Sequence, residues 1–229
     1  MPLYPQFSST TTASSLLEWR QTAARIGLRA PETVICCYPT EPGFVASVVN
    51  RIHGGLEQLT AVAQDRPLRL LFSAHGLPQK VVDGGDPYQW QVEQSVAAVV
   101  AALGRRELDH VLCYQSRVGP LKWLSPSIDE EIRRAGARRQ GAARRADRLR
   151  FPSIPRRWSS WISNNAIWQR SMACRLISRV PTVDALPGFI AGLAGEIRRA
   201  LETGTTVGSA GGGRICPAQC GFCTFTKGE

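Results

Sequence analysis

Residues 68–76, L-R-L-L-F-S-A-H-G, decide the fold class of this chain of 229 residues. Their apolar first half predicts a buried strand, and the polar turn that follows it contains His75. A helix is predicted over 86–103, because an aspartate can cap it, a proline takes its first position and an apolar stripe follows. Another apolar run at 110–114 predicts the next strand. This alternation with short connections predicts an α/β fold, a parallel sheet flanked by helices.

The pattern extends to both sides of this centre but fails over 138–177. In that segment arginine pairs and three tryptophans follow neither a period of two nor a period of 3.6, so no strand or helix is predicted there. The other predicted elements are a strand end at 3–7, a helix at 16–26, a strand at 33–38, a helix at 45–59 and a helix at 189–201, followed by a flexible Gly/Ser/Thr-rich linker at 203–213.

Charge and composition restrict the functional classes. The chain carries 28 Lys plus Arg against 18 Asp plus Glu, a net charge of +10. Residues 138–179 alone hold 11 arginines and one acidic residue, 11 − 1 = +10, so the rest of the chain is balanced at 17 against 17. No apolar run reaches the roughly 18 residues of a membrane-spanning helix. Seven cysteines, an odd number without an export signal, argue against a disulfide framework and predict a reducing, cytoplasmic location.

Polar motifs follow two of the predicted strands, and in parallel sheets ligands gather at the carboxyl ends of strands. His75 lies at one such end, where an imidazole can accept a proton or bind a borderline metal such as iron. The alternative is a histidine with a purely structural role. His53 and His110 have no comparable surroundings, and we expect them to be surface or packing residues.

Four motifs in one order resemble the ferrochelatase family. They are L-Y-P-Q-F-S-S-T-T-T-A-S-S at 3–15, L-F-S-A-H-G-L-P at 71–78, G-D-P-Y at 85–88 and Y-Q-S-R-V-G-P-L-K-W-L at 114–124. The similarity covers 2–136 and resumes over 179–201. It implies a chelatase-like fold, mostly the C-terminal of two similar Rossmann-like domains. It also implies insertion of Fe²⁺, as substrate, into protoporphyrin IX to form protohaem in haem biosynthesis.

The resemblance also implies site residues. It places the active-site histidine at His75, as acceptor of a pyrrole proton or as ligand of the Fe²⁺ substrate. It places the porphyrin cleft along one strand end, where Arg117 could pair with a propionate and Trp123 could lie against the ring. The alternative is a capped strand end with a packed tryptophan. The resemblance implies protoporphyrin IX as the binding partner and is compatible with peripheral contact with a membrane. No nucleic-acid partner is expected, and the oligomeric state stays open. The expected cleft residues are Tyr114, Gln115, Ser116, Arg117 and Trp123.

This sequence departs from the family pattern in two places. The family has an N-terminal Rossmann-like domain before the first motif, so we interpret 1–30 as a remnant of that domain with a crossover helix. Residues 31–202 are then the C-terminal chelatase-like domain. The family also has a catalytic glutamate in a segment rich in histidine and acids, whereas 138–178 contains neither glutamate nor histidine. We therefore expect the chain as written to be inactive and prone to aggregation.

Codon degeneracy offers an origin for the second departure. Read one base out of phase, residues 151–176 can spell S-V-H-S-E-T-L-V-E-L-D-I-E and then Q-R-D-L-A-A-K-H-G-V-P-A-Y, as the family has. The other phase across 141–149 can spell V-L-L-V-V-P-I-A-F, the missing strand. We infer frameshifts around 138–178. The alternative is an Arg/Trp-rich segment that binds nucleic acid, although its charge has no periodic placement.

The last predicted part, 203–229, is a linker and a cysteine-rich tail. Its C-x₃-C-x₂-C pattern has metal-ligand spacing, and thiolates suit zinc or iron–sulfur clusters. The resemblance implies a [2Fe-2S] cluster, because some ferrochelatases carry one on C-terminal cysteines. Their remaining ligand comes from the position of Ser9, which leaves a fourth ligand unassigned; the alternative is a disordered tail. The expected ligands are Cys216, Cys220 and Cys223, whereas Cys36, Cys37 and Cys113 are expected to be buried strand thiols.

Two further functions stay open at this point. One is a related chelatase that metallates another tetrapyrrole, which metal competition assays would separate from a ferrochelatase. The other is a degenerate remnant that has no enzymatic activity.

Overall fold

The computed structural model describes residues 1–63, 67–117, 119–138, 141–146, 177–204 and 206–224. The chain forms two compact units. Unit 1 consists of Met1–Ala46, Pro78–Ala98 and Ala185–Glu229, and unit 2 consists of Ser47–Leu77 and Val99–Asp184. The proposed frameshift, with its three tryptophans, falls largely on 147–176, which lie outside the described residues. Mixed helices and parallel strands confirm the predicted α/β class.

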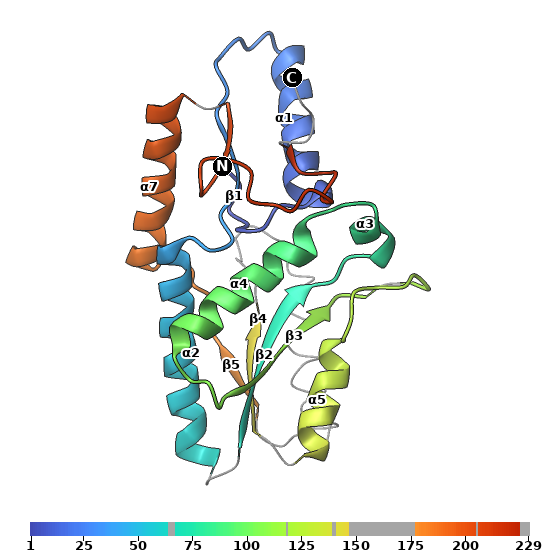
Figure 1. The fold of residues 1–229 in the computed structure, drawn as a ribbon, viewed down its shortest axis with the longest axis vertical. Coiled ribbons are helices and arrows are strands. Elements are labelled where there is room, and N and C mark those ends of the chain that lie inside the picture. Colours follow the sequence, from blue (N-terminus) through green and yellow to red (C-terminus); the bar gives the residue numbers. More distant parts are fainter. Residues whose placement is uncertain (64–66, 118, 139–140, 147–176, 205, 225–229) are drawn as a thin grey trace. The chain divides into compact units, whose positions relative to one another are not determined.

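Unit 2 contains a parallel sheet of strand order β3-β2-β4-β5 (Figure 1). Strand β2 pairs with β3 so that the predicted site residue His75 lies opposite Gln115. Both strands were predicted from their apolar runs; toward the polar turn, β2 extends three residues beyond its predicted run of 68–72 and β3 one residue beyond 110–114. The strands of this sheet are β2 (Leu68–His75), β3 (Asp109–Gln115), β4 (Gly141–Ala146) and β5 (Ile177–Val180).

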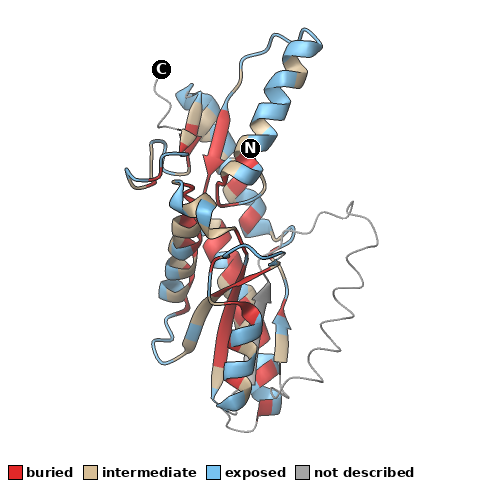
Figure 2. Ribbon diagram, turned by 90° about the vertical axis from the view of Figure 1, so that its right-hand side faces the viewer, coloured by how far each residue is buried: buried red, intermediate tan, exposed pale blue. Residues whose placement is uncertain are grey.

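The core of unit 2 lies between this sheet and helix α5 (Ile128–Ala137), which packs against β2, β3 and β4. Leu71 and Cys113 from the strands are fully buried against Ile128 and Ala135 of the helix. Figure 2 colours the ribbon by burial and shows buried residues along the strands. A capping box fixes the start of α5, because Ser127 and Glu130 bond each other's backbone N–H groups. This helix was not predicted, although the Ser127–Glu130 capping box can be read from the sequence.

Strand β4 corrects the expectation that 138–177 contains no regular structure. Residues 141–146, G-A-A-R-R-A, pair in parallel with β2 on one side and with β5 on the other. The reason is that a strand between two neighbours is held by backbone hydrogen bonds on both edges, which do not require alternating side chains. An apolar pattern is therefore not necessary for this strand.

Helix α2 (Pro42–Ala63) contributes residues 47–63 to unit 2 and packs closely on β5. A Cβ atom at Gly55 would lie 2.8 Å from Cγ2 of Val180, which is fully buried. A side chain at position 55 would therefore push the helix away from the strand.

Unit 1 is built around a parallel pair of short strands, β1 (Val34–Cys37) and β6 (Val207–Ser209). Strand β6 corrects the expectation of a plain flexible linker at 203–213. The predicted strand end at 3–7 is also wrong, because these residues form bends. The helical elements of this unit are the π-helical turn η1 (Ser9–Ala13), α1 (Ser14–Arg25), α3 (Gln79–Asp83), the first part of α4 (Tyr88–Leu103) and α7 (Pro187–Thr203).

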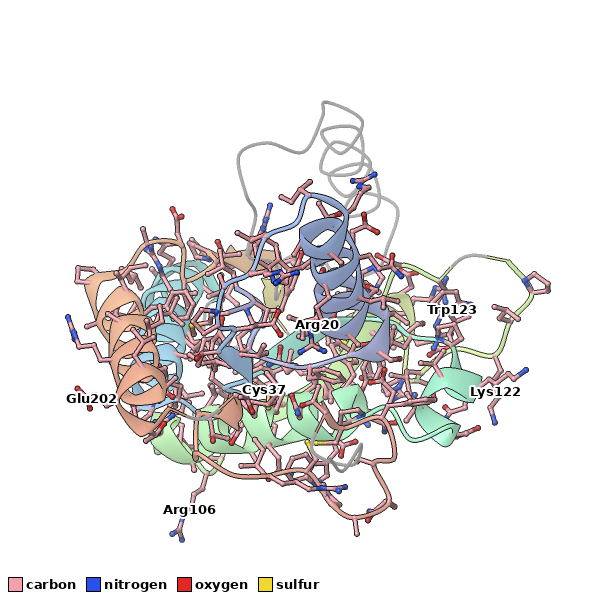
Figure 3. The ribbon with its side chains drawn as sticks, turned by 90° about the horizontal axis from the view of Figure 1, so that it is seen from above. Arg20, Cys37, Arg106, Lys122, Trp123 and Glu202 are labelled. Carbon is pink, nitrogen blue, oxygen red and sulfur yellow. The ribbon has the colours of Figure 1, made fainter. Side chains whose placement is uncertain are left out.

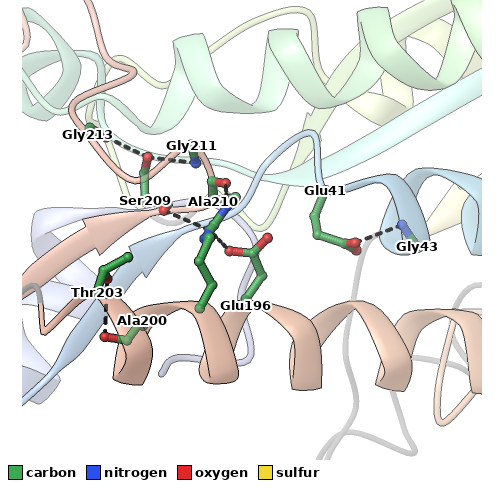
Figure 4. Close-up of polar contacts among 10 residues, drawn as sticks. Glu41, Gly43, Glu196, Ala200, Thr203, Ser209, Ala210, Gly211 and Gly213 are labelled. Carbon is green, nitrogen blue, oxygen red and sulfur yellow. Dashed lines mark hydrogen bonds and ion pairs between the residues drawn. The ribbon is translucent and has the colours of Figure 1, made fainter.

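Polar contacts hold the segment after β6 in place (Figure 4). The guanidinium of Arg199 on α7 donates to the carbonyl oxygens of Ser209, at 3.2 Å, and Ala210. The Ser209 hydroxyl donates to the Gly213 carbonyl at 2.6 Å and accepts from the Gly211 N–H at 3.1 Å. These bonds fix the chain directly before the cysteine tail.

Of the helices in the described ranges, none combines the length and the apolar character needed to cross a lipid bilayer.

Candidate functional site

The carboxyl ends of β2 and β3 lie side by side, as expected for neighbouring parallel strands. Backbone hydrogen bonds connect the loops that follow them. The Gly76 N–H donates to the Gln115 carbonyl at 2.7 Å, and the Leu124 N–H donates to the Leu77 carbonyl at 3.0 Å. We call the set His75, Gly76, Tyr114, Gln115, Ser116, Arg117 and Trp123 the strand-end site. All of its members belong to unit 2.

The imidazole of His75 is oriented by its own loop. Its Nδ1 lies 2.8 Å from the Gly76 carbonyl oxygen, and a carbonyl can only accept, so Nδ1 carries the hydrogen in this arrangement. A neutral ring then has its lone pair on Nε2. His75 is exposed, whereas the preceding Ala74 is buried. The geometry therefore presents a base or metal ligand at the end of a rigid strand.

The Y-Q-S-R motif at the end of β3, residues 114–117, contributes both buried and exposed residues to the strand-end site. Tyr114 and Gln115 are buried at the end of β3, while Ser116 has a left-handed backbone with φ of 66°. Such a conformation is uncommon for a residue other than glycine and turns the chain sharply. Arg117 is exposed and donates from Nη2 to the Leu124 carbonyl at 2.8 Å. This bond ties Arg117 to the loop backbone.

Trp123 lies half-buried in the same loop, next to the exposed Lys122 (Figure 3). Its indole Nε1 is buried, and no residue in the described ranges accepts a hydrogen bond from it. A Cβ atom at Gly76 would lie 3.5 Å from Cε3 of Trp123 and 2.8 Å from the Gln115 carbonyl oxygen. Glycine at position 76 therefore lets the two loops approach each other.

Asp86, from the G-D-P-Y motif, is the helix cap that the sequence predicts, and it also binds the N-terminal segment of unit 1, which was not predicted. One carboxylate oxygen accepts from the Ser8 hydroxyl at 3.0 Å, the Ser9 N–H at 2.7 Å and the Ser9 hydroxyl at 2.6 Å. The other oxygen accepts from the Tyr88 N–H at 2.9 Å and caps α4. The hydroxyl of Ser9 is thus already engaged.

The three tail cysteines are buried together against Trp90 and Ile215. Cys36 and Cys37 on β1 are buried too, as predicted, but they are more than packing residues. Their sulfur atoms lie 3.4 Å apart, and Ile215 packs against both this pair and the tail cysteines. No local sequence pattern signals this long-range contact. We call the set Cys36, Cys37, Cys216, Cys220 and Cys223 the thiol cluster; all belong to unit 1.

Neighbouring groups shift the acidity of these thiols in opposite directions. Hydrogen bonds from Cys223 and Cys37 lower the pKa of Cys216 to about 3. The Gln91 amide adds to this by donating to the Cys216 sulfur at 3.1 Å. The hydrogen bonds of Cys37 to Cys216 and Cys36, together with burial, raise the pKa of Cys37. These shifts favour the thiolate form at Cys216, and thiolates are the metal-binding form of cysteine.

Within the thiol cluster, the sulfurs of Cys36 and Cys37 are in direct contact at 3.4 Å. Across the part of the chain that the structure describes, no three or more His, Cys, Asp or Glu side chains are grouped so that they could hold one metal ion. This argues against a preformed mononuclear zinc site. A binuclear iron–sulfur cluster makes a different demand, because each of its two irons takes a pair of thiolates.

A parallel α/β sheet with a histidine at a strand end defines a protein with a chelatase-like fold. The structure of "SirB from Bacillus subtilis with Fe3+" has the same fold, with a TM-score of 0.53 and 12% identity, over 90% of this chain and 72% of that one. The sequence model of the ferrochelatase family matches residues 1–143. The chain belongs to the ferrochelatase family.

Curated ferrochelatases show the same relationship. The chain is 40% identical to the ferrochelatase of Caulobacter vibrioides over 230 residues, which cover all of this chain and 63% of that protein. It is 38% identical to the enzyme of Hyphomonas neptunium over 97% of this chain and 60% of that protein. Over 141 residues, 62% of the chain, it is 50% identical to the enzyme of Phenylobacterium zucineum. The chain thus spans less than two thirds of the length of these relatives.

Proposed function

We propose that this chain carries the histidine side of a ferrochelatase active site, which inserts Fe²⁺ into protoporphyrin IX to form protohaem. The reaction releases two pyrrole protons for each Fe²⁺ bound. It therefore needs a base, a ligand that hands the ion over, and a slot for a flat macrocycle. The observation that carries the proposal is His75 at the end of β2, with its ring oriented by the Gly76 carbonyl.

The other members of the strand-end site are assigned to the macrocycle. Trp123 offers an aromatic face and a buried indole N–H without a described protein partner. Arg117 offers a guanidinium at the exposed rim, where it can pair with a propionate if it releases the Leu124 carbonyl. Tyr114, Gln115 and Ser116, at the end of β3, are assigned to the same porphyrin cleft as Trp123 and Arg117. His75 either accepts a pyrrole proton through Nε2 or binds the Fe²⁺ substrate.

We also propose a [2Fe-2S] cluster on Cys216, Cys220 and Cys223, with a fourth protein ligand. The support is that all three are buried in one group, which argues against a disordered tail over the described residues. When bound, such a cluster carries one electron reversibly and ties together the segments that supply its ligands. We place the reaction in the cytoplasm, because the sequence has the composition of a protein from a reducing compartment.

The frameshift around 138–178 remains part of the proposal. Its support is that the family model stops matching at residue 143, a few residues into the arginine-rich segment. Because 138–178 holds no glutamate or histidine, we expect the chain as written to form no haem by itself. Resequencing codons 136–180 tests the frameshift. Stop codons in the shifted frame, or no glutamate motif there, would refute it.

A chimera tests the proposed reaction. Residues 1–137 of this chain replace the matching part of the Caulobacter vibrioides ferrochelatase, and haem formation from Fe²⁺ and protoporphyrin IX is followed by absorbance. We expect turnover, with Fe²⁺ and protoporphyrin IX preferred in competition against other divalent metals and tetrapyrroles. Preference for another tetrapyrrole would favour the related-chelatase alternative. A folded chimera that binds no tetrapyrrole would contradict the proposal.

A further inference from the structure

Cys36 and Cys37 are neighbours in the sequence whose sulfur atoms lie 3.4 Å apart at the end of β1. Cys37 is labelled in Figure 3. The two thiols are 2% and 1% exposed and are buried with Phe7, and Val207 and Ile215 pack against this group. All of these residues belong to unit 1. The strand therefore carries a buried pair of thiols in apolar surroundings.

A bulge in β1 brings the two sulfurs together. In the pairing of β1 with β6, Ile35 lies opposite Gly208 and Cys37 lies opposite Ser209, so Cys36 is an extra residue. Successive side chains of a regular strand point to opposite faces, whereas a bulge removes that alternation and re-aims a side chain. The backbone itself therefore sets the separation of the two sulfurs.

This separation decides what the pair can bind. A disulfide usually joins Cα atoms about 4.4–6.8 Å apart, and those of adjacent residues are only about 3.8 Å apart, so oxidation to a disulfide is disfavoured. One atom bonded to each sulfur at about 2.3 Å, an ordinary metal–thiolate length, would hold the two sulfurs at an angle of about 95°. Tetrahedral zinc prefers about 109°. Trivalent arsenic keeps a lone pair, and its three bonds form a pyramid with angles near a right angle.

We propose that Cys36 and Cys37 form a binding site for small trivalent arsenicals, in which one arsenic atom bonds both sulfurs and carries a small apolar third substituent. Methylarsonous acid, CH₃As(OH)₂, is such a molecule. Two As–S bonds form, two As–O bonds break, and the two thiol protons leave with the hydroxyl groups as two waters. Arsenic stays trivalent, so no electron is transferred. The site needs only two protein ligands, in keeping with the absence of a group of three among the described residues.

The surroundings of the pair favour a neutral adduct over a charged ion. Phe7, Ala13 and Val207 lie around the two thiols and are apolar, and burying an unpaired charge among such side chains is costly. A methylated arsenic atom bonded to two thiolates carries no net charge. Thiolates are also soft ligands, which suit soft, polarisable elements.

Access to the buried pair requires the edge of β1 to open. Among the described residues β1 has one strand neighbour, β6, which is three residues long. A two-stranded sheet is marginally stable, and local opening costs less than global unfolding. The Ala210 N–H, which donates to the Cys37 carbonyl at 2.9 Å, has to be released. We expect slow entry, followed by reclosure over the bound arsenic.

The test uses the full chain, which is reduced, incubated with methylarsonous acid and then washed with excess 2-mercaptoethanol, a monothiol. Trypsin cuts after arginine and lysine, so residues 30–51 form a peptide that holds Cys36 and Cys37 and no other cysteine, and the three tail cysteines fall together in 215–227. In wild-type protein the 30–51 peptide should gain one CH₃As group and lose two hydrogens. Arsenic on 215–227 with none on 30–51 would overturn the proposal.

Serine variants identify the two sulfurs. Cys36→Ser and Cys37→Ser should each lose at least about nine tenths of the arsenic on 30–51, because a single thiol cannot close the second bond and the monothiol then competes. Cys113→Ser, at a buried strand thiol of unit 2, is the matched control and should keep the wild-type amount. Arsenic that survives the wash in either of the first two variants would show that binding does not need both sulfurs.

A stability measurement shows whether the folded protein binds the arsenical. A ligand that prefers the folded state raises the thermal midpoint, whereas one that prefers the unfolded chain lowers it. Because the folded pair already has the required separation, methylarsonous acid should raise the midpoint of wild type more than that of Cys36→Ser. A fall, or an equal change in the two proteins, would overturn the proposal. Neither measurement depends on haem formation or on a cluster at the tail.

Discussion

The strand-end site of unit 2 and the thiol cluster of unit 1 are assembled in different ways. His75 and the Tyr114–Trp123 loop follow two strands that pair along their whole length, and two backbone hydrogen bonds join their loops. The thiol cluster combines β1, the tail and supporting contacts from α4, which are separated by long stretches of sequence. The first arrangement depends on local pairing and the second on long-range packing. Substitutions in each unit should therefore reveal which contacts stabilise it.

The largest effect on stability is expected at Glu131 of α5, which is fully buried in unit 2. Its carboxylate pairs with Arg69, at 2.9 Å, and with Arg134. Glu131→Ala leaves the buried Arg69 without this partner and should lower the free energy of unfolding by about 3–5 kcal/mol. Urea unfolding measures the loss. Glu130→Ala, at an exposed neighbour, is the control and should cost about 1 kcal/mol through the helix cap.

Asp86→Ala should produce the next largest effect, in unit 1. It leaves the Ser8 hydroxyl, the Ser9 hydroxyl and two backbone N–H groups without their acceptor, so we expect a loss of about 3 kcal/mol. Asp83→Ala removes only an exposed contact with Gln79 and should change stability by less than about 0.5 kcal/mol. Equal effects of the two substitutions in urea unfolding would show that the Asp86 network does not hold unit 1 together.

Gly76→Ala tests whether the loops of the strand-end site need their close approach. The new Cβ would lie 2.8 Å from the Gln115 carbonyl oxygen, so the loops must separate at a cost of about 1–3 kcal/mol. Porphyrin fluorescence should report weaker binding. Gly54→Ala in α2 is the matched control, because its Cβ meets no heavy atom within 4 Å and alanine favours the helix. A variant at position 76 that binds porphyrin as wild type would show that the approach is unnecessary.

The smallest expected effect is on how the thermal stability of unit 2 depends on pH. Hydrogen bonds from the Ser127 backbone and side chain lower the pKa of Glu130 below its ordinary value. The folded-state pKa is depressed, so this carboxylate stabilises α5 above its unfolded pKa and loses that contribution as the pH falls through the folded value. Glu130→Gln, which has no titrating carboxyl group, should remove the dependence. Comparing thermal midpoints of both proteins from pH 3 to pH 6 measures it, and identical slopes would contradict the assignment.

The sequence predicts the parts of the molecule whose signals are local. Strands β2 and β3 contain short apolar runs, and the polar residues after them mark the strand-end site. Strand β4 could not be predicted, because its pairing partners and not its own Arg/Ala composition make it a strand. The packing of the tail cysteines against Trp90 could not be predicted either, since it joins segments that are far apart in sequence. Helix α5 had a readable capping box and was missed.

The most direct test of the account is the effect of His75 on iron insertion. In the chimera with the Caulobacter vibrioides enzyme, the initial rate of haem formation is compared between wild type, His75→Ala and His110→Ala. His110 is an exposed histidine on β3, outside the strand-end site, and serves as the control. Loss of a positioned base or ligand should lower the rate about 10²–10⁴-fold for His75→Ala and leave His110→Ala within about twofold of wild type. A His75→Ala chimera as fast as the control would contradict the assignment of the strand-end site.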